Sequence, residues 1–261
     1  MAKKISDLGL AAAIKGDELL ELVQAGVNVK ALAGALLSPG HIDGLKMVYA
    51  SGNALTVRSG AAFIQGLGRV LFSPADIAIT GMTLAASTWY HVYLFLNGSV
   101  PAVEVVTTTP AVAYSGTARA KTGDTSRRYL GSLLTDGSGN VWNFFHDGLY
   151  VRWLQSIGID GFRPLALGTA IATTNVSLAA WIPSICQLAY LRLTNTSTDQ
   201  TFKIDIPNRV GSNYGIFSVD KGQAVYAEVP TDASQTVSYK FNGAPTAGGA
   251  YIDVFGYRLE R

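Results

Sequence analysis

Charged residues are scarce in this chain. Only 15% of its 261 residues are Asp, Glu, Lys or Arg, against about a quarter in an ordinary globular protein. The formal net charge is +2, and the basic pairs Lys3–Lys4 and Arg127–Arg128 are too small to predict a nucleic-acid partner. Because 48% of the residues are hydrophobic, we expect a folded core rather than disorder. Surplus apolar surface also favours burial between copies of the chain.

Cysteine is nearly missing as well. Cys186 is the only one, so no disulfide can form within the chain, and its apolar neighbours predict a small buried side chain. No run of about 18 apolar residues occurs, so no membrane insertion is expected. No charged leader precedes an apolar stretch at the N-terminus, so no signal peptide is predicted.

Long amphipathic helical patterns are also lacking, which argues against alternating β–α architecture. Short runs of β-forming residues take their place, separated by Gly, Pro and Asn turn signals. The predicted fold class is mainly β: a short N-terminal segment (1–40), a central antiparallel β domain (41–160) and a C-terminal antiparallel β domain (161–261). The strands expected in the central domain are 55–57, 60–64, 77–79, 89–96, 103–109, 129–134, 141–145 and 149–153.

Two patterns refine the β domains. Residues 136–140 are rich in Gly, Ser and Asn and predict a hairpin loop between 129–134 and 141–145. Phe202, Ile204 and Ile206 alternate with Lys203 and Asp205, which predicts a half-buried strand. Turn signals about every ten residues predict a β-sandwich or jelly roll for the C-terminal domain. Its other expected strands are 188–193, 216–219, 224–229, 236–241 and 251–255.

The leader admits two interpretations. Asp17 could cap a short helix through Leu22 that ends at Gly26. Alternatively, residues 20–24 and 27–30 form a hairpin that turns at Ala25–Gly26, since Gly permits the positive φ of a tight turn. Leu20, Leu22 and Gln24 would then share one face. We expect a short helix over 32–37 to follow, ended by Ser38-Pro39-Gly40.

Catalytic and metal-binding patterns are weak. His41, His91 and His146 have no metal-ligand spacing. His91 is expected to pack within its strand, and His146 to end one. The acids stand mostly in turns (Asp124, Asp136, Asp160, Asp199, Asp232), which disfavours the paired carboxyl groups of a glycosidase. Gly-x-Ser-x-Gly and phosphate-loop patterns do not occur. We therefore expect no enzyme, no cofactor and no catalytic or metal residue.

The segment 118–131 is unusually basic for this chain. Arg119, Lys121, Arg127 and Arg128 surround Asp124. They could contact an anion or a glycan, because Arg offers a planar fork of donors. The favoured interpretation is a structural loop whose arginines bind Asp124 or backbone carbonyls.

Several motifs, degenerate singly but consistent in order, resemble those of tailed-bacteriophage tail-fibre and appendage proteins. Lys4-Ile5-Ser6-Asp7-Leu8 followed by 16–30 is similar to their N-terminal attachment segment. The stretch 52–64, the region around 89–131 and the ending 251–257 also look like parts of such chains. No collagen, coiled-coil or β-helix repeat is present, so a short appendage is expected rather than a long shaft.

The resemblance implies a structural virion protein. Its N-terminus would attach to another virion protein, its central domain would form a homotrimer, and its C-terminal loops would meet a host-surface glycan or protein. The alternatives are a capsid-decorating or collar fibre and, less favoured, a glycan-degrading tail spike. The residues implied in attachment are Ile5, Leu8, Leu20, Leu22, Gln24, Gly26 and Val27. Those in the receptor-facing loops 195–200, 208–214 and 242–249 are Asn195, Asp199, Arg209, Tyr214 and Asn242.

Overall fold

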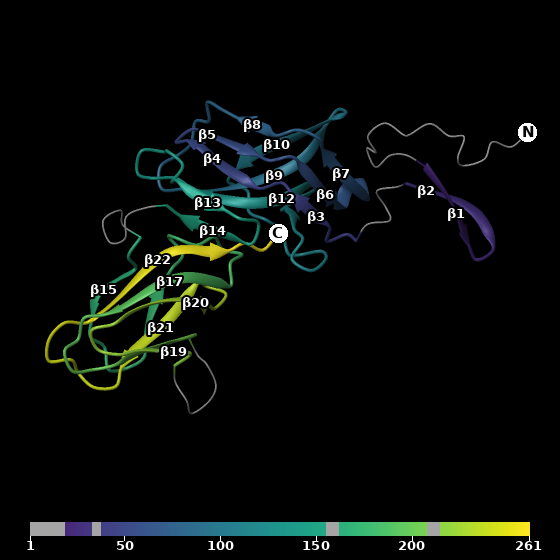
Figure 1. Cartoon of the computed structure of the whole chain (residues 1–261). Helices are drawn as coiled ribbons and strands as arrows, with labels where there is room; N and C mark the ends of the chain where they lie inside the picture. Colours follow the sequence, from purple (N-terminus) through teal and green to yellow (C-terminus); the bar gives the residue numbers. More distant parts are fainter. Residues whose placement is uncertain (1–18, 33–37, 155–161, 208–214) are drawn as a thin grey trace, which may run out of the picture.

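The computed structural model describes residues 19–32, 38–154, 162–207 and 215–261. It is built almost entirely of antiparallel strands, and no α-helix occurs in these ranges. The predicted mainly β class is confirmed. Figure 1 shows two β units side by side, with the N-terminal hairpin apart from them.

The described part of the leader is a hairpin. Strand β1 (Leu19–Gln24) pairs antiparallel with β2 (Val27–Leu32). Ala25 and Gly26 connect them with φ of 49° and 79°, the positive values that a two-residue turn requires. The hairpin interpretation is therefore confirmed and the capped helix is wrong. Leu32 belongs to β2 rather than to a helix, and 33–37 lie outside the described residues.

Three sheets build the first unit. The largest has the order β10-β9-β12-β11, and two three-stranded sheets have the orders β3-β6-β7 and β4-β5-β8. The 3-10 helix η3 (Gln65–Leu67) links β6 to β7. The strand bounds are β3 Ile42–Gly44, β4 Met47–Ser51, β5 Ala54–Val57, β6 Gly60–Ile64, β7 Arg69–Ser73, β8 Ile77–Ile79, β9 Trp89–Asn97, β10 Val100–Val106, β11 Ala120–Lys121 and β12 Asp124–Leu134.

Two sheets form the second unit. One has the order β13-β14-β22-β17-β20, with β15 also paired to β22; the other has the order β16-β21-β18-β19. Alternate residues of β17 are buried, and they join residues of β18 and β21 in one core, as in a sandwich. The strand bounds are β13 Phe144–His146, β14 Tyr150–Trp153, β15 Leu165–Gly168, β16 Thr174–Ser177, β17 Leu188–Asn195, β18 Phe202–Asp205, β19 Phe217–Val219, β20 Ala224–Pro230, β21 Thr236–Phe241 and β22 Ala250–Arg258.

The predicted boundary at residue 160 does not coincide with a boundary between sheets. Strands β13 and β14 precede it, yet β14 pairs with β22 in the sheet of the second unit. The loop predicted at 136–140 is present, but the residues on either side of it pair only through one isolated bridge, between Thr135 and Val141. The strands beyond that bridge enter different sheets, β12 beside β9 and β13 beside β14.

Two strand predictions need correction. The run expected at 103–109 is β10 at 100–106, because the Asn97-Gly98 turn starts pairing at once and Val100 faces Asn97. Asp205 was expected on the exposed face of its strand, but it is fully buried. Its carboxylate accepts hydrogen bonds from the backbone N–H of Ile206 (2.8 Å) and Gly215 (2.7 Å), which explains why the acid is tolerated there.

Candidate functional site

One end of the sandwich gathers four chain connections; we call it the distal end. They are 169–173, 196–201, 220–223 and 242–249. The strand register places them together: Gly168 faces Ala250, Phe202 faces Phe241, and Thr194 faces Ala224. Loops at one end of a sandwich are a common place for binding residues. Two of the three predicted receptor-facing loops therefore lie side by side.

Asn195 is a structural residue, which corrects its prediction as an exposed contact. Its side chain is 1% exposed. The amide nitrogen Nδ2 donates to the carbonyl oxygens of Gln200 and Val219, both at 2.8 Å, and Oδ1 accepts from Ser197 N–H at 2.9 Å. These three bonds hold the start of the 196–201 loop against β19, so no polar atom is left for a ligand.

The loops 196–201 and 242–249 are bound to each other. Thr196 N–H donates to Gly249 O at 2.9 Å, and Thr246 N–H donates to the Asp199 carboxylate at 3.2 Å. Gly248 has φ of +75° and passes so close to the Thr196 carbonyl that a side chain would collide with it. The pair therefore forms one compact surface rather than two independent loops.

The remaining predicted contacts differ in their placement. Asp199 and Asn242 are exposed at the distal end. Arg209 and Tyr214 lie outside the described residues. In the leader, Ile5 and Leu8 lie outside the described residues. Leu20, Leu22 and Gln24 of β1 are in register with Ala31, Val29 and Val27 of β2, next to Gly26 in the turn.

The basic segment 118–131 is structural, as the favoured interpretation predicted. Arg119 donates to Ala111 O at 3.1 Å and pairs with Glu260 at 3.1 Å. Arg128 is 1% exposed and donates to the Tyr114 hydroxyl at 2.8 Å. The other basic side chains are also engaged: Lys121 pairs with Glu104 at 2.9 Å, and Arg127 lies over the Phe95 ring and 3.6 Å from Asp124.

Two histidines are buried. His91 lies in β9 of the first unit, and His146 lies in β13, where it contacts β4 of the first unit. The His91 Nδ1 lies 2.8 Å from the Ser132 hydroxyl, and the His146 Nδ1 accepts from Met47 N–H at 2.9 Å. Burial lowers the pKa of His91 to about 4 and that of His146 to about 3. Both rings are therefore neutral at pH 7. His91 packs within its strand as expected, and His146 is the last residue of β13, also as expected.

The acids in turns bind the backbone of their own turns. Asp124, Asp136 and Asp232 each accept a hydrogen bond from the N–H two residues ahead, at 2.9, 2.8 and 2.9 Å. Such bonds mimic a backbone turn. The Ser126 hydroxyl and N–H groups lower the pKa of the Asp124 carboxyl. Burial raises the pKa of the Asp136 carboxyl, but the N–H groups of Asn140 and Ser138 outweigh it, so the pKa lies below its usual value. No cluster of metal-binding side chains occurs within the described ranges.

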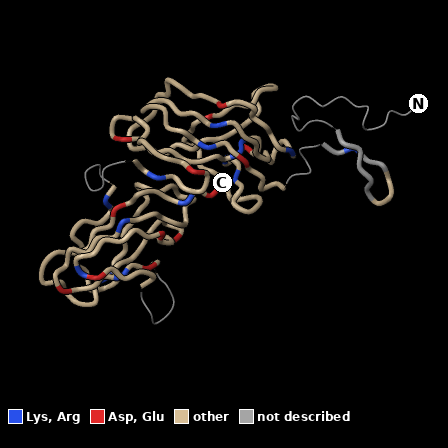
Figure 2. The backbone as a smooth tube through the Cα atoms, viewed as in Figure 1, with Lys and Arg blue, Asp and Glu red and all other residues tan. Residues whose placement is uncertain are grey.

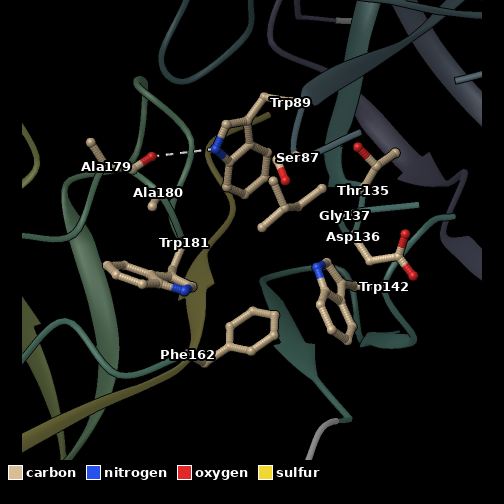
Figure 3. Close-up of a pocket in the computed structure, with 11 residues that line it drawn as sticks. Ser87, Trp89, Thr135, Asp136, Gly137, Trp142, Phe162, Ala179, Ala180 and Trp181 are labelled. Atoms are coloured by element: carbon tan, nitrogen blue, oxygen red, sulfur yellow. Dashed lines mark hydrogen bonds between the residues drawn. The ribbon is translucent and has the colours of Figure 1, made fainter. Parts of the chain in front are cut away.

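A tryptophan-lined cleft, which sequence reasoning missed, lies where the two units meet. Its volume is about 370 Å³, within the range of small-molecule pockets. Trp89 comes from β9, Trp142 from the segment before β13, and Trp181 from the turn after β16 (Figure 3). The remaining lining residues are Ser87, Leu134, Thr135, Asp136, Gly137, Phe162, Ala179 and Ala180.

Hydrogen bonds fix parts of the cleft wall across the two units. The Trp89 indole N–H donates to Ala179 O at 3.3 Å, and the Trp153 N–H donates to Trp181 O at 3.2 Å. Within the lining, the Trp142 and Phe162 rings meet edge to face, with centroids 5.2 Å apart. All four tryptophans of the chain thus stand at the junction of the units, although they are spread over 89–181 in sequence.

No linear signal could have found this cleft. The four tryptophans stand in segments that are distant in sequence, and long-range pairings such as β14 with β22 and β16 with β21 bring these segments together. Charge gives no signal either: Figure 2 shows acidic and basic residues interspersed over both units. Comparisons with models of known protein families and with curated proteins find no match to this chain. No helix long and apolar enough to cross a membrane was found in the part of the chain that the structure describes.

Proposed function

We propose that this chain is a structural protein of a tailed-bacteriophage particle, a short tail fibre or similar appendage. The hairpin attaches it to another virion protein, the β units assemble as a homotrimer, and the distal end faces the host surface. The motif order in the sequence, from the leader to the ending, motivates the family.

The observation that carries the proposal is that the hairpin has no further strand partner among the described strands. Among the described strands, β1 and β2 pair only with each other. A two-stranded hairpin alone is marginally stable in water, and its outer edges are templates for another strand. Val27 in the hairpin is 62% exposed. A partner protein that covers the hairpin or adds a strand to it would resolve both problems.

The polar side chains that could serve in catalysis are bonded to the protein itself, which supports a structural rather than an enzymatic role. The turn acids bind backbone N–H groups, and His91 and His146 are buried within the core. An acid–base pair for glycan cleavage needs two carboxyl groups that face a common space. The turn acids Asp124, Asp136 and Asp232 instead fold back on their own loops.

Deletion of residues 1–32 tests the attachment role. We expect the truncated protein to fold, because the two β units share a buried core of their own, and to be missing from purified particles. The full-length chain is the matched control, and light scattering should give three times the chain mass for both proteins. Normal incorporation of the truncated protein would refute the attachment role, and a monomer would refute the trimer.

A further inference from the structure

The cleft at the junction of the two units has hydrogen-bond donors without acceptors. Among the hydrogen bonds of the described residues, none involves the indole N–H of Trp142 or Trp181, and both side chains are only partly buried. Figure 3 draws both nitrogens on the sides of the rings that face the hollow. The Trp89 N–H is engaged by Ala179 O, so two of the three lining indoles can still donate.

The other polar groups of the cleft are mostly satisfied by the protein. The Thr135 hydroxyl donates to Ala85 O at 2.7 Å and accepts from Thr88 N–H at 2.8 Å. The Asp136 Oδ1 accepts from the N–H groups of Ser138 and Asn140 at 2.8 and 2.9 Å. A ligand would therefore meet aromatic surface, two N–H donors and the exposed hydroxyl of Ser87.

These features select the chemistry of the ligand. A purely apolar molecule would remove two indole N–H groups from water without pairing them, which opposes binding. A cation would meet the two indole N–H groups, which carry partial positive charge. The one lining carboxylate, Asp136, is already held by its own loop.

A sugar ring matches the cleft on each count. Its C–H faces can lie against the aromatic rings, and its hydroxyl oxygens can accept from both indole N–H groups. We propose that this cleft binds a neutral saccharide, with Trp142 and Trp181 as the donors that orient it. The site is separate from the distal loops, and the inference does not depend on the role of the hairpin.

The experiment uses the purified full-length protein and a panel of free sugars: glucose, galactose, mannose, rhamnose and N-acetylglucosamine. Labelling of the tryptophans with ¹⁵N gives one indole N–H signal for each of the four residues. We expect at least one sugar to shift the signals of Trp142 and Trp181 and to leave that of Trp153 in place, with a Kd of about 1 mM, typical of weak small-ligand binding.

Substitution with phenylalanine removes the donor and keeps an aromatic ring. Trp142→Phe and Trp181→Phe should each weaken binding about tenfold, the value of one hydrogen bond of about 1.4 kcal/mol. Tyr226→Phe, an exposed aromatic residue outside the cleft lining, is the matched control and should bind like the parent protein.

Three results would overturn the inference. The first is that no sugar in the panel shifts an indole signal at tens of millimolar. The second is that tetramethylammonium shifts the two signals and the sugars do not, which would identify a cation site. The third is that affinity survives both phenylalanine substitutions. Because the test uses no particle, its outcome is independent of the deletion experiment on the hairpin.

Discussion

The distal end and the tryptophan cleft lie at opposite ends of the same sandwich and use their polar groups differently. At the distal end, both polar atoms of the Asn195 side chain are bonded to the protein, and Asp199 binds the neighbouring loop through Thr246 N–H. At the cleft, Trp142 and Trp181 keep free donors. Polar stretches in the sequence therefore predicted the positions of the loops. The indole N–H groups without a protein partner became visible only in the structure.

The same contrast extends to titrating groups. The buried histidines stand on the cleft side: His146 binds Met47 of the first unit, and His91 shares Ser132 with the contact to Tyr257 of β22. The distal end is held by carboxylates and backbone groups. Acid should therefore weaken the two ends in different pH ranges.

The largest expected effect is a loss of stability on mild acidification. His91 and His146 have pKa values of about 4 and about 3 in the folded protein, against about 6.5 in the unfolded chain. Because the folded values are lower, protonation favours unfolding: stability is complete above pH 6.5 and is lost as the pH falls toward 4. Between pH 6.5 and 5 each histidine should cost about 2 kcal/mol, measured by urea unfolding followed by circular dichroism.

A variant separates the two histidines. His146→Gln removes one titrating group and should remove about half of this pH dependence. The distal carboxyl of Asp199 has a pKa below its usual value of 3.8, through hydrogen bonds from Thr246 and Ser197 that outweigh desolvation, so it should contribute only below about pH 4. An unfolding free energy that stays constant from pH 6.5 to 5 would contradict the buried neutral histidines.

The next largest effect is expected at Asn195. Asn195→Ala leaves the carbonyl oxygens of Gln200 and Val219 and the N–H of Ser197 without partners in a buried site. It should lower the free energy of unfolding by about 3 kcal/mol, measured by urea unfolding at pH 7. The exposed neighbour Asn242→Ala should stay within about 0.5 kcal/mol. Equal effects at both positions would show that Asn195 is not the anchor of the distal loops.

The smallest of the three effects is expected at Gly248. Gly248→Ala places a methyl group against the Thr196 carbonyl at a positive φ, and should cost about 2 kcal/mol through strain and loss of the loop contact. Gly137→Ala is the control, since nothing lies within 4 Å of a side chain there. Faster hydrogen exchange confined to 196–201 and 242–249 would locate the effect; unchanged exchange would argue against close contact of the loops.

Local sequence patterns predicted most strands. Long-range pairing determines which sheet each strand joins, and this could not be predicted from the sequence. The β-forming run 89–96 and the Asn97-Gly98 turn are visible in sequence, because they depend on neighbours. Nothing local shows that β14 leaves the first unit to join β22, or that Asp205 is buried with two backbone donors. The cleft escaped prediction for the same reason: four segments that are separate in sequence build it.

The position of β22 in the six-stranded sheet sets the order of events during synthesis. This strand follows all its partners in the chain, yet it is internal to the sheet, with β17 on one edge and both β14 and β15 on the other. Until the ribosome has added 250–258, those strands have no neighbour along these edges. The sheet can therefore be completed only after 250–258 have been made, and a chain terminated before them leaves open strand edges that invite aggregation.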